Sequence, residues 1–551
     1  MNLCGAALEA YLGRLNGALR RAAARPDEAQ RRVLGRLLWR ARDTWFGRRH
    51  GFASIRGPAD FARAVPIADY AGRIEMFRRI QAGEPDVAWP GRVRWFARTS
   101  GTTVGLKYIP LTTEALRSHA RAIRAVLAYY ARDGRGLAAR LLEGKLLFMG
   151  GSASPVPLGP GTWAGDLSGL RQHGLPWWAR PWFEPGVDVA RLPEWHERIE
   201  AAARRTLHCD VRFLAGIASW IVALFDRLCE LGGVPPDGGI SRIWPNLQVY
   251  VHGGTHLDPY RPILDRYFAP GSARAKPGSA GAKPGRAPRY LGTYTASEGS
   301  IAIQAQADDP SLELQTAAGL FYEFVPREEF GRPGARRLTV REVERGVPYC
   351  IVLSTCAGLW AQAIDDVVQF TSVVPPRLVF AGRYGALLNA FAEHVGGHEV
   401  AAAVGAAARA TQARVAEFTV APRYFTAERH TGAHQYVVEF EEPPAAGLAA
   451  FAREIDRLLL ENINYRAKRV GNVTLTLPEI VPVPRGTFHA WMASRGKLGG
   501  QNKVPVCASD RRWADPLLAV ASPLVEPGRG ARPAPPGRSP AKEAEGGPNA
   551  Q

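Results

Sequence analysis

The sequence has little of what builds disulfide frameworks or membrane spans. Six cysteines occur among 551 residues, and no two of them form a C-x-x-C pair, which favours reduced thiols over a disulfide framework. No apolar run approaches the roughly 20 residues that a membrane helix needs. The N-terminus also lacks the charged-then-apolar profile of a signal peptide. We therefore expect a soluble, cytoplasmic protein without membrane contacts.

Signatures of two common enzyme classes are missing as well. There is no Gly-x-Ser-x-Gly elbow of the kind that serine hydrolases use. The histidines His119, His173, His196 and His256 have no metal-ligand spacing to one another or to cysteines, so we assign no zinc site.

Negative charge is scarce relative to positive charge. The chain has 51 Asp and Glu against 70 Lys and Arg, which gives a formal net charge of +19 and would attract anionic partners. No zinc-finger spacing or nucleic-acid motif accompanies this charge, so we expect no specific nucleic-acid partner. A polyanion binder using residues 270–289 stays an alternative, because this Pro/Gly/Ala/Ser-rich insert has five basic residues and no acidic one.

Local patterns predict an α/β protein with two domains. Leu8, Leu12, Leu15 and Leu19 form one stripe of an N-terminal helix that Pro26 ends,. Further helices are expected where apolar residues recur at helical spacing (116–130, with Leu116, Ala120, Ile123, Leu127 and Tyr130; 213–231; 398–409; 448–461), and strands at 247–251, 301–305, 320–325, 350–354 and 436–441.

Changes in composition predict the domain boundaries. A large domain is expected over residues 1–384, with the insert 270–289 as a disordered surface loop. Elements become shorter from about residue 385, which predicts a small α/β domain over 385–522. The Pro/Gly-rich tail, 523–551, is expected to be disordered.

The stretch from Ala97 to Pro110 is the most suggestive for chemistry. It contains the four hydroxyl residues Thr99, Ser100, Thr102 and Thr103, two glycines, and Lys107. Glycines let backbone N–H groups face one point, and hydroxyls and a cation add to them, so the stretch suits a phosphate chain. The spacing is not that of a Walker A loop. A surface loop rich in Ser, Thr and Gly is the alternative.

Three further polar segments are candidates for a site. Tyr294 to Glu298 places an aromatic ring, hydroxyls and a carboxylate at a strand end, groups suited to stacking, phosphate contacts and Mg²⁺ ligation. Asp365-Asp366 follows an apolar run and would accept hydrogen bonds from ribose, although two exposed acids in a turn is the alternative. Lys503 lies in the glycine-rich run Gly-Gly-Gln-Asn-Lys-Val-Pro, where most lysines are merely solvated.

In their order and spacing these segments resemble the adenylate-forming superfamily, and within it the auxin-responsive promoter family of acyl-acid amido synthetases. The resemblance runs from roughly Gly51 to Cys507. The matching stretches are Thr99–Pro110, Tyr294–Glu298, Ala357–Trp360 leading to Asp366, Arg383–Val395, Gly486–Phe488 and Gly499–Pro505.

The resemblance implies a large N-terminal domain of mixed sheets and helices and a small mobile C-terminal α/β domain. It also implies ATP-dependent activation of a carboxylic acid to an acyl-adenylate, from which an amine, usually that of an amino acid, displaces AMP. ATP and Mg²⁺ are then the expected cofactors. Small-molecule acids and amines are the expected partners, and we expect a monomer.

The same resemblance implies roles for individual residues. Lys503 and Glu298 would be catalytic, and Glu298 would hold Mg²⁺. Asp366 and Arg383 would hold the ribose, and Tyr294 would stack on the adenine. The remaining nucleotide contacts would come from Thr99, Ser100, Thr102, Thr103 and Lys107 at the phosphates, Gly253 and Gly254 near the adenine, and Thr295 and Ser297 near the α-phosphate.

Several positions depart from the family pattern. Val104 replaces a glycine of the hydroxyl loop, Asp365 replaces the glycine before Asp366, Ala361 and Ala363 replace arginines, and Val506 replaces another arginine. These departures leave two alternatives open beside an active amido synthetase: a catalytically impaired nucleotide-binding homologue, and an acyl ligase with a thiol acceptor.

Overall fold

The computed structural model describes most of the chain. The described residues are 3–100, 106–132, 134, 136–173, 177, 179–192, 194–253, 257, 260–268, 287–306, 309–384, 387–388, 390–391, 393, 395–424, 431–471, 475–497, 503–508 and 510–521. Most of the predicted insert and the predicted tail lie outside these ranges.

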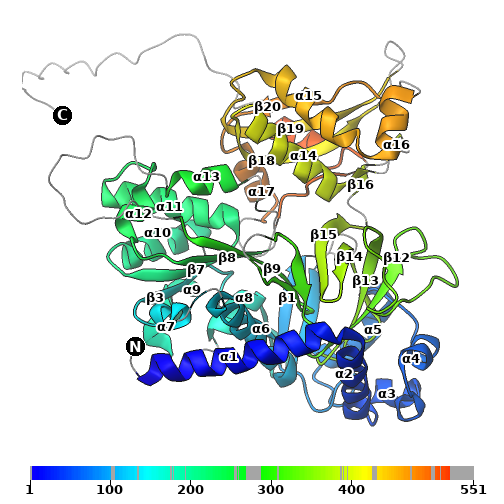
Figure 1. Ribbon diagram of the computed structural model, residues 1–551. Helices are drawn as coiled ribbons and strands as arrows, with labels where there is room; N and C mark the ends of the chain where they lie inside the picture. The colour runs from blue at the N-terminus through cyan, green and yellow to red at the C-terminus, as the bar shows by residue number, and fades with distance from the viewer. Residues whose placement is uncertain are drawn as a thin grey trace, which may run out of the picture.

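The chain begins with helices that lie along one side of the molecule (Figure 1). They are α1 (Leu3–Ala24), α2 (Pro26–Ala41), α3 (Trp45–Arg49), α4 (Pro58–Ala64) and α5 (Ile74–Gln81). Pro26 stands in the first turn of α2, where its missing N–H costs nothing, so the predicted break is confirmed. The buried Gln30 side chain donates to the Leu320 carbonyl at 2.9 Å and accepts from the Tyr322 N–H at 2.8 Å, which fixes α2 to a strand of the main sheet.

An 11-stranded sheet forms the centre of the molecule. Its order is β12 (Leu320–Pro326), β13 (Pro348–Thr355), β14 (Gln362–Val373), β15 (Pro376–Arg383), β11 (Leu312–Leu314), β10 (Gly299–Gln304), β9 (Arg289–Ala296), β8 (Val249–Gly253), β7 (Val211–Ala215), β3 (Lys145–Phe148) and β6 (Phe183–Glu184). Neighbours from β12 to β9 pair antiparallel, and those from β9 to β6 pair parallel. Strand β9 is therefore the junction between two kinds of sheet.

A four-stranded sheet in the order β2-β1-β5-β4 lies beside it. Its strands are β1 (Trp95–Ser100), β2 (Leu106–Leu111), β4 (Val156–Gly159) and β5 (Thr162–Gly165). Helices pack around the two sheets: α6 (Thr113–Ala131), α7 (Leu137–Leu141), α8 (Leu167–His173), α9 (Gly186–Ala190), α10 (Trp195–Thr206), α11 (Ala218–Gly232), α12 (Gly239–Ile243) and α13 (Arg261–Arg266).

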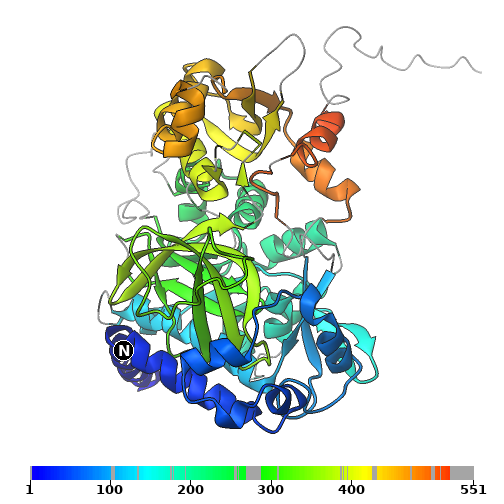
Figure 2. The ribbon, with the colours of Figure 1, turned by 90° about the vertical axis from the view of Figure 1, so that its right-hand side faces the viewer.

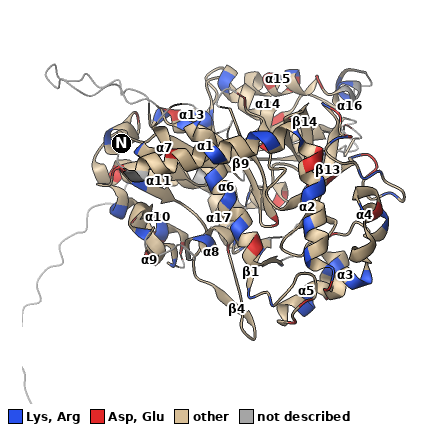
Figure 3. Cartoon of the chain, turned by 60° about the horizontal axis from the view of Figure 1, so that its bottom comes forward, with Lys and Arg blue, Asp and Glu red and all other residues tan. Residues whose placement is uncertain are grey.

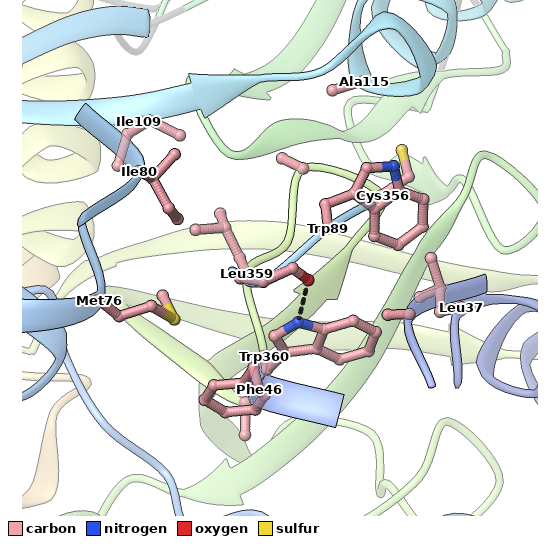
Figure 4. Packing of buried hydrophobic residues seen from close by; sticks show 14 of the residues in the cluster. Leu37, Phe46, Met76, Ile80, Trp89, Ile109, Ala115, Cys356, Leu359 and Trp360 are labelled. Carbon is pink, nitrogen blue, oxygen red and sulfur yellow. Dashed lines mark hydrogen bonds between the residues drawn. The ribbon is translucent and has the colours of Figure 1, made fainter. Parts of the chain in front are cut away.

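Trp360 is the centre of the largest buried hydrophobic cluster (Figure 4). Its ring lies 4.6 Å from that of Phe52 and 6.3 Å from that of Phe46. Its indole N–H donates to the Ala88 carbonyl at 3.0 Å, because a buried indole needs a polar partner. The Ala357–Trp360 segment thus joins the first hundred residues to the antiparallel half of the sheet.

The C-terminal elements build a separate three-stranded sheet, β18-β19-β20, which stands at one end of the molecule in two perpendicular views (Figures 1 and 2). The predicted division near residue 385 stays a prediction. The elements are β16 (Leu387–Leu388), β17 (Val395–Gly396), α14 (Gly397–Ala410), β18 (Arg414–Arg423), β19 (Ala433–Glu442), α15 (Leu448–Leu459), α16 (Ile463–Arg466), β20 (Glu479–Val483), α17 (Thr487–Ser494) and α18 (Ala514–Ala521).

Three local predictions were wrong in detail. The apolar run 213–231 begins as strand β7 and becomes helix only after Gly216, because its first residues pair between β3 and β8. On α6 the most buried face holds Ser118, His119 and Ala122, whereas Leu116 is half-buried and Ala120 is exposed. Arg289, predicted to end the disordered insert, is the first residue of β9. None of the described helices is long and apolar enough to cross a bilayer.

Candidate active site

The carboxyl ends of the parallel strands lie at one edge of the large sheet, and glycines stand at or just after these ends. Met149-Gly150-Gly151 follows β3 and Gly216 follows β7, while Gly253 ends β8. At Gly151 an added Cβ would lie 2.2 Å from Asp166 Oδ2, and at Gly253 it would lie 2.7 Å from the Thr293 carbonyl oxygen. Such close approach requires glycine. Ligands of sheets with parallel strands bind at this edge.

The turn from β9 to β10 belongs to the same edge. It carries Ser297 and Glu298, of which Ser297 is buried and Glu298 is half-buried. Thr295, at the end of β9, is exposed, and its hydroxyl lies 3.4 Å from the Ser300 hydroxyl across the turn. The predicted segment is therefore a tight hairpin that presents polar groups where β9 ends.

Tyr294 and Asp366 meet although 72 residues separate them. The Tyr294 hydroxyl donates to Asp366 Oδ2 at 2.6 Å, and both residues are buried. The Tyr294 ring packs edge-on against Phe380, with 5.5 Å between ring centroids. Asp366 is the cross-strand partner of Arg383 on β15. The structure thus brings together three residues predicted from separate motifs, although adenine stacking and ribose binding stay predictions.

The described parts of the hydroxyl-rich stretch, Ala97–Ser100 and Leu106–Pro110, belong to the two strands β1 and β2. Strands β1 and β2 pair antiparallel, so that Thr99 is opposite Lys107. The Lys107 ammonium lies 6.0 Å from the ring centroid of Tyr70. Thr102, Thr103 and Val104 lie outside the described residues, as do Gly254 and the side chains of Ser100 and Arg383.

Lys503 stands at the start of a segment that runs beside β18. The Pro505 carbonyl accepts from the Thr419 hydroxyl at 2.7 Å, and the Val506 carbonyl accepts from the Val420 N–H at 2.9 Å. The Ala508 N–H donates back to the Val420 carbonyl at 3.1 Å. Lys503 itself is exposed. An exposed lysine on an anchored segment can present its charge without loss of backbone position.

Helix α8, which no motif indicated, also reaches this edge. Gln172 on α8 donates to the Phe148 carbonyl at the end of β3 at 2.9 Å, and Ser168 accepts from the Gly151 N–H at 2.9 Å. Between these two residues stands Arg171. Among the described residues it has no hydrogen bond or ion pair, and burial lowers its pKa to about 10. The sequence feature that could have indicated this part of the site is the glycine pair Gly150-Gly151, which stands one residue after the strand β3.

His119 on α6 lies between Arg171 and the β9–β10 turn. The pKa of His119 is lowered to about 3, mainly by burial and also by the Arg171 charge, while a hydrogen bond to the Ser297 backbone opposes the shift. The imidazole is therefore neutral at physiological pH. His119 supports the turn beside Glu298 and leaves Arg171 as a cation.

The charges around the edge suit an anionic ligand. Within the described part of the chain, no three His, Cys, Asp or Glu side chains form a group that could hold a metal. A single carboxylate such as Glu298 fits Mg²⁺, which keeps waters and substrate phosphates as its other ligands. Basic residues elsewhere are spread along the exposed sides of α1, α2 and α6 (Figure 3).

Comparisons with known proteins give a consistent result. The chain matches the GH3 family N-terminal domain over residues 16–156, the GH3 family central domain over 314–383 and the GH3 family C-terminal domain over 398–512. It is 28% identical over 295 residues to indole-3-acetic acid-amido synthetase GH3.3 of Arabidopsis thaliana, covering 50% of this chain and 45% of that protein. It is 26% identical over 294 residues to GH3.8 of Oryza sativa subsp. indica, covering 49% and 45%. These matches thus span about half the length of the relatives.

Solved structures share the fold over a greater length. The GH3.15 acyl acid amido synthetase superposes with a TM-score of 0.71 at 18% identity, covering 91% of this chain and 94% of that one. The Arabidopsis GH3.15 protein in complex with 2,4-DB superposes with the same TM-score, covering 93% and 96%.

Proposed function

The chain belongs to the GH3 family, and from this premise we propose that it is an ATP-dependent acyl-acid amido synthetase. It activates a carboxylic acid to an acyl-adenylate and transfers the acyl group to an amine, which we take to be that of an amino acid. The buried Tyr294–Asp366 hydrogen bond of 2.6 Å, beside the turn that carries Glu298, is the observation that carries this proposal. It joins two motif segments at the edge where a nucleotide would bind.

The proposed roles follow from charge. A carboxylate that attacks an α-phosphate brings two anions together, so donors and cations must neutralise the charge that develops. Thr99 and Lys107 on the hairpin face the phosphates, together with Thr295 and Ser297. Mg²⁺, held by Glu298, supplies further neutralisation when it is bound with ATP.

Two further residues complete the nucleotide and catalytic roles. Asp366 binds the ribose, since its carboxylate is held in place by Tyr294. Lys503 supplies a cation from the segment beside β18, where it acts on the carboxylate and the α-phosphate in the transition state.

Arg171 supports the proposed amine acceptor. A guanidinium with no anionic partner among the described residues is suited to a carboxylate that arrives with the substrate, which it can bind through two parallel N–H donors. The α-carboxylate of an amino acid is such a group, because it does not react. We assign its binding to Arg171, and we assign to His119 the support of the adjacent turn.

The remaining features of the proposal concern the whole chain. A large unit of residues 1–384 and a small mobile unit of residues 385–522 close around the substrates, which excludes water from an adenylate that hydrolyses readily. We also propose that the protein is cytoplasmic and monomeric.

Exchange of labelled pyrophosphate into ATP tests the proposal. The assay is run across a panel of aryl and alkyl acids that includes indole-3-acetic acid and 2,4-DB, with and without Mg²⁺. Acid-dependent exchange is the expected result. ATP binding without exchange for any acid, at high enzyme concentration, would contradict it and favour an impaired homologue. Exchange followed by consumption of coenzyme A, with amino acids inert, would select a thiol acceptor.

A further inference from the structure

A hydrogen bond links the connection after β8 to the C-terminal sheet. The Tyr260 hydroxyl donates to Glu417 Oε2 on β18 at 3.1 Å. Tyr260 is only 7% exposed and stands seven residues beyond Gly253, directly before α13. It therefore belongs to the carboxyl edge of the parallel strands. Figure 1 shows β18 to the right of α13, although the two residues of this bond are 157 positions apart in the chain.

The same strand anchors the segment of Lys503. Glu417 is two residues before Thr419, whose hydroxyl binds the Pro505 carbonyl, and three before Val420, which bonds to Val506 and Ala508. Glu417, Thr419 and Val420 belong to one continuous strand. A contact that fixes the position of Glu417 therefore also fixes the residues that bind the segment of Lys503.

We propose that the Tyr260–Glu417 hydrogen bond is a latch that docks β18, and with it the segment of Lys503, onto the carboxyl edge of the parallel strands. Tyr260 and Glu417 are positioning residues, because they act through Lys503 and not on the substrate. The docking rests on geometry alone, whereas its effect on rate rests on the proposed function of Lys503.

The latch has a direction of pH dependence. The pKa of Glu417 is raised to about 7, mainly by burial and also by Glu439 on β19, while hydrogen bonds from the Tyr260 hydroxyl and the Phe418 N–H oppose the shift. An undocked, exposed Glu417 would lose its proton near the ordinary value of 4.5. Docking thus takes up a proton between these two values, so the docked state weakens as the pH rises towards 7. Between pH 6 and pH 8.5 the docking equilibrium falls by about tenfold.

Other charged groups lie at the same contact. Glu441 on β19 has a pKa raised by burial and by Asp226 of α11, and lowered by Arg485, Arg414 and Arg266. It adds to the pH dependence, so removing Glu417 reduces the slope without abolishing it.

Hydrogen–deuterium exchange tests the docking without any reaction. Uptake is measured on peptides covering 257–268 and 414–423, the two sides of the contact. The uptake rate of each variant is divided by the uptake rate of the wild type at the same pH, so that the intrinsic pH dependence of amide exchange cancels. Tyr260→Phe should speed uptake by about fivefold to tenfold, the usual worth of one hydrogen bond. Glu417→Gln keeps an acceptor for Tyr260 and docks without taking up a proton, so it should exchange more slowly than the wild type, and its uptake relative to the wild type should fall by about a further tenfold between pH 6 and pH 8.5.

A matched control separates docking from general loosening. Tyr465 donates to Asp456 at 2.7 Å, a buried tyrosine–carboxylate pair within the C-terminal elements. Tyr465→Phe should leave uptake of the 257–268 peptide unchanged. Equal uptake in Tyr260→Phe and wild type would overturn the latch, as would a Glu417→Gln ratio that does not change with pH.

Pyrophosphate exchange then tests the link to Lys503. Tyr260→Phe should lower kcat by about tenfold and leave the KM for ATP unchanged, because the nucleotide contacts stay intact. Glu417→Gln should flatten the pH profile of kcat between pH 6 and pH 8.5. Faster deuterium uptake with unchanged kcat would overturn the positioning role. A wild-type enzyme without exchange would contradict the proposed function, while the deuterium result would still decide the latch.

Discussion

A double-mutant cycle on Tyr294 and Asp366 gives the sharpest test of the nucleotide site. The Tyr294 hydroxyl is the donor in a buried 2.6 Å bond to the Asp366 carboxylate. Hydrogen bonds to charged groups are worth about 1.5–3 kcal/mol. Tyr294→Phe removes this bond and leaves the ring packed against Phe380. If Asp366 binds the ribose, its orientation depends on that hydroxyl.

The expected magnitudes follow from this geometry. Asp366→Asn should weaken ATP binding by about 10- to 100-fold, and Tyr294→Phe by about tenfold, since a loss of 1.4 kcal/mol is a factor of about ten. The double variant should bind no more weakly than Asp366→Asn, because Tyr294 acts through Asp366. The coupling would then be about 1–2 kcal/mol, within the range for residues in contact. Isothermal calorimetry with ATP and with 2′-deoxy-ATP measures all four corners of the cycle.

Tyr349→Phe is the matched control for this cycle. Tyr349 is buried in the same hydrophobic cluster, and its hydroxyl accepts from the Glu344 N–H at 3.0 Å. Loss of the Tyr349 hydroxyl should leave the ATP affinity unchanged. Additive effects of Tyr294→Phe and Asp366→Asn, with wild-type discrimination against 2′-deoxy-ATP in both, would refute the reasoning. Asp366 would then be a structural carboxylate of the sheet.

Three other predictions concern single residues. Lys503→Ala should slow pyrophosphate exchange by roughly 10²-fold or more with ATP affinity nearly intact, whereas Lys107→Ala should weaken ATP binding too. Exchange at the wild-type rate in Lys503→Ala would exclude Lys503 from catalysis. Arg171→Gln should raise the KM for an amino acid by about tenfold or more and leave the KM for the matching decarboxylated amine unchanged. Equal effects on the two KM values would contradict the binding of the amino-acid carboxylate by Arg171. His119 has a pKa lowered to about 3, so the free energy of unfolding should fall as the pH drops below about 6.5, by up to about 1.4 kcal/mol per pH unit. His119→Gln should reduce that slope in denaturant titrations, and an unchanged slope would show that another group causes it.

Elements with strong local patterns could be predicted from the sequence. The leucine stripe and Pro26 fixed the first two helices, and the helices at 398–409 and 448–461 match α14 and α15 within two residues. These elements depend on contacts within one or two turns, which periodicity reports directly. The apolar run 213–231 has no such periodicity, since a strand buried on both faces reads like a buried helix. Only its place between β3 and β8 decides the outcome.

The candidate site was predicted as separate motifs and not as an arrangement. Tyr294 and Asp366 lie 72 residues apart, and Tyr260 and Glu417 lie 157 apart. Neither pair can be recognised from the local sequence, because the order of strands in the sheets, and not the spacing along the chain, brings the two residues of each pair together. Arg171 was missed for the same reason: its significance comes from the end of β3 nearby and from the lack of an anion among the described residues.

One departure from the family pattern, Asp365 in place of glycine, has a backbone cost that the structure makes explicit. Asp365 has φ of 60° and Ala361 has φ of 42°, both in the left-handed region that favours glycine. Non-glycine residues there cost about 1–2 kcal/mol, and aspartate is among the residues that tolerate it best. The Asp365 carbonyl accepts from the Tyr384 N–H at 2.6 Å, and the Ala361 carbonyl accepts from the Ala68 N–H at 3.2 Å. Both unfavourable conformations are thus held by long-range backbone bonds, and the Asp366 strand keeps its register with Arg383. Replacement of the glycine before Asp366 therefore costs stability and adds one negative charge beside the proposed ribose site, while the geometry of that site is retained.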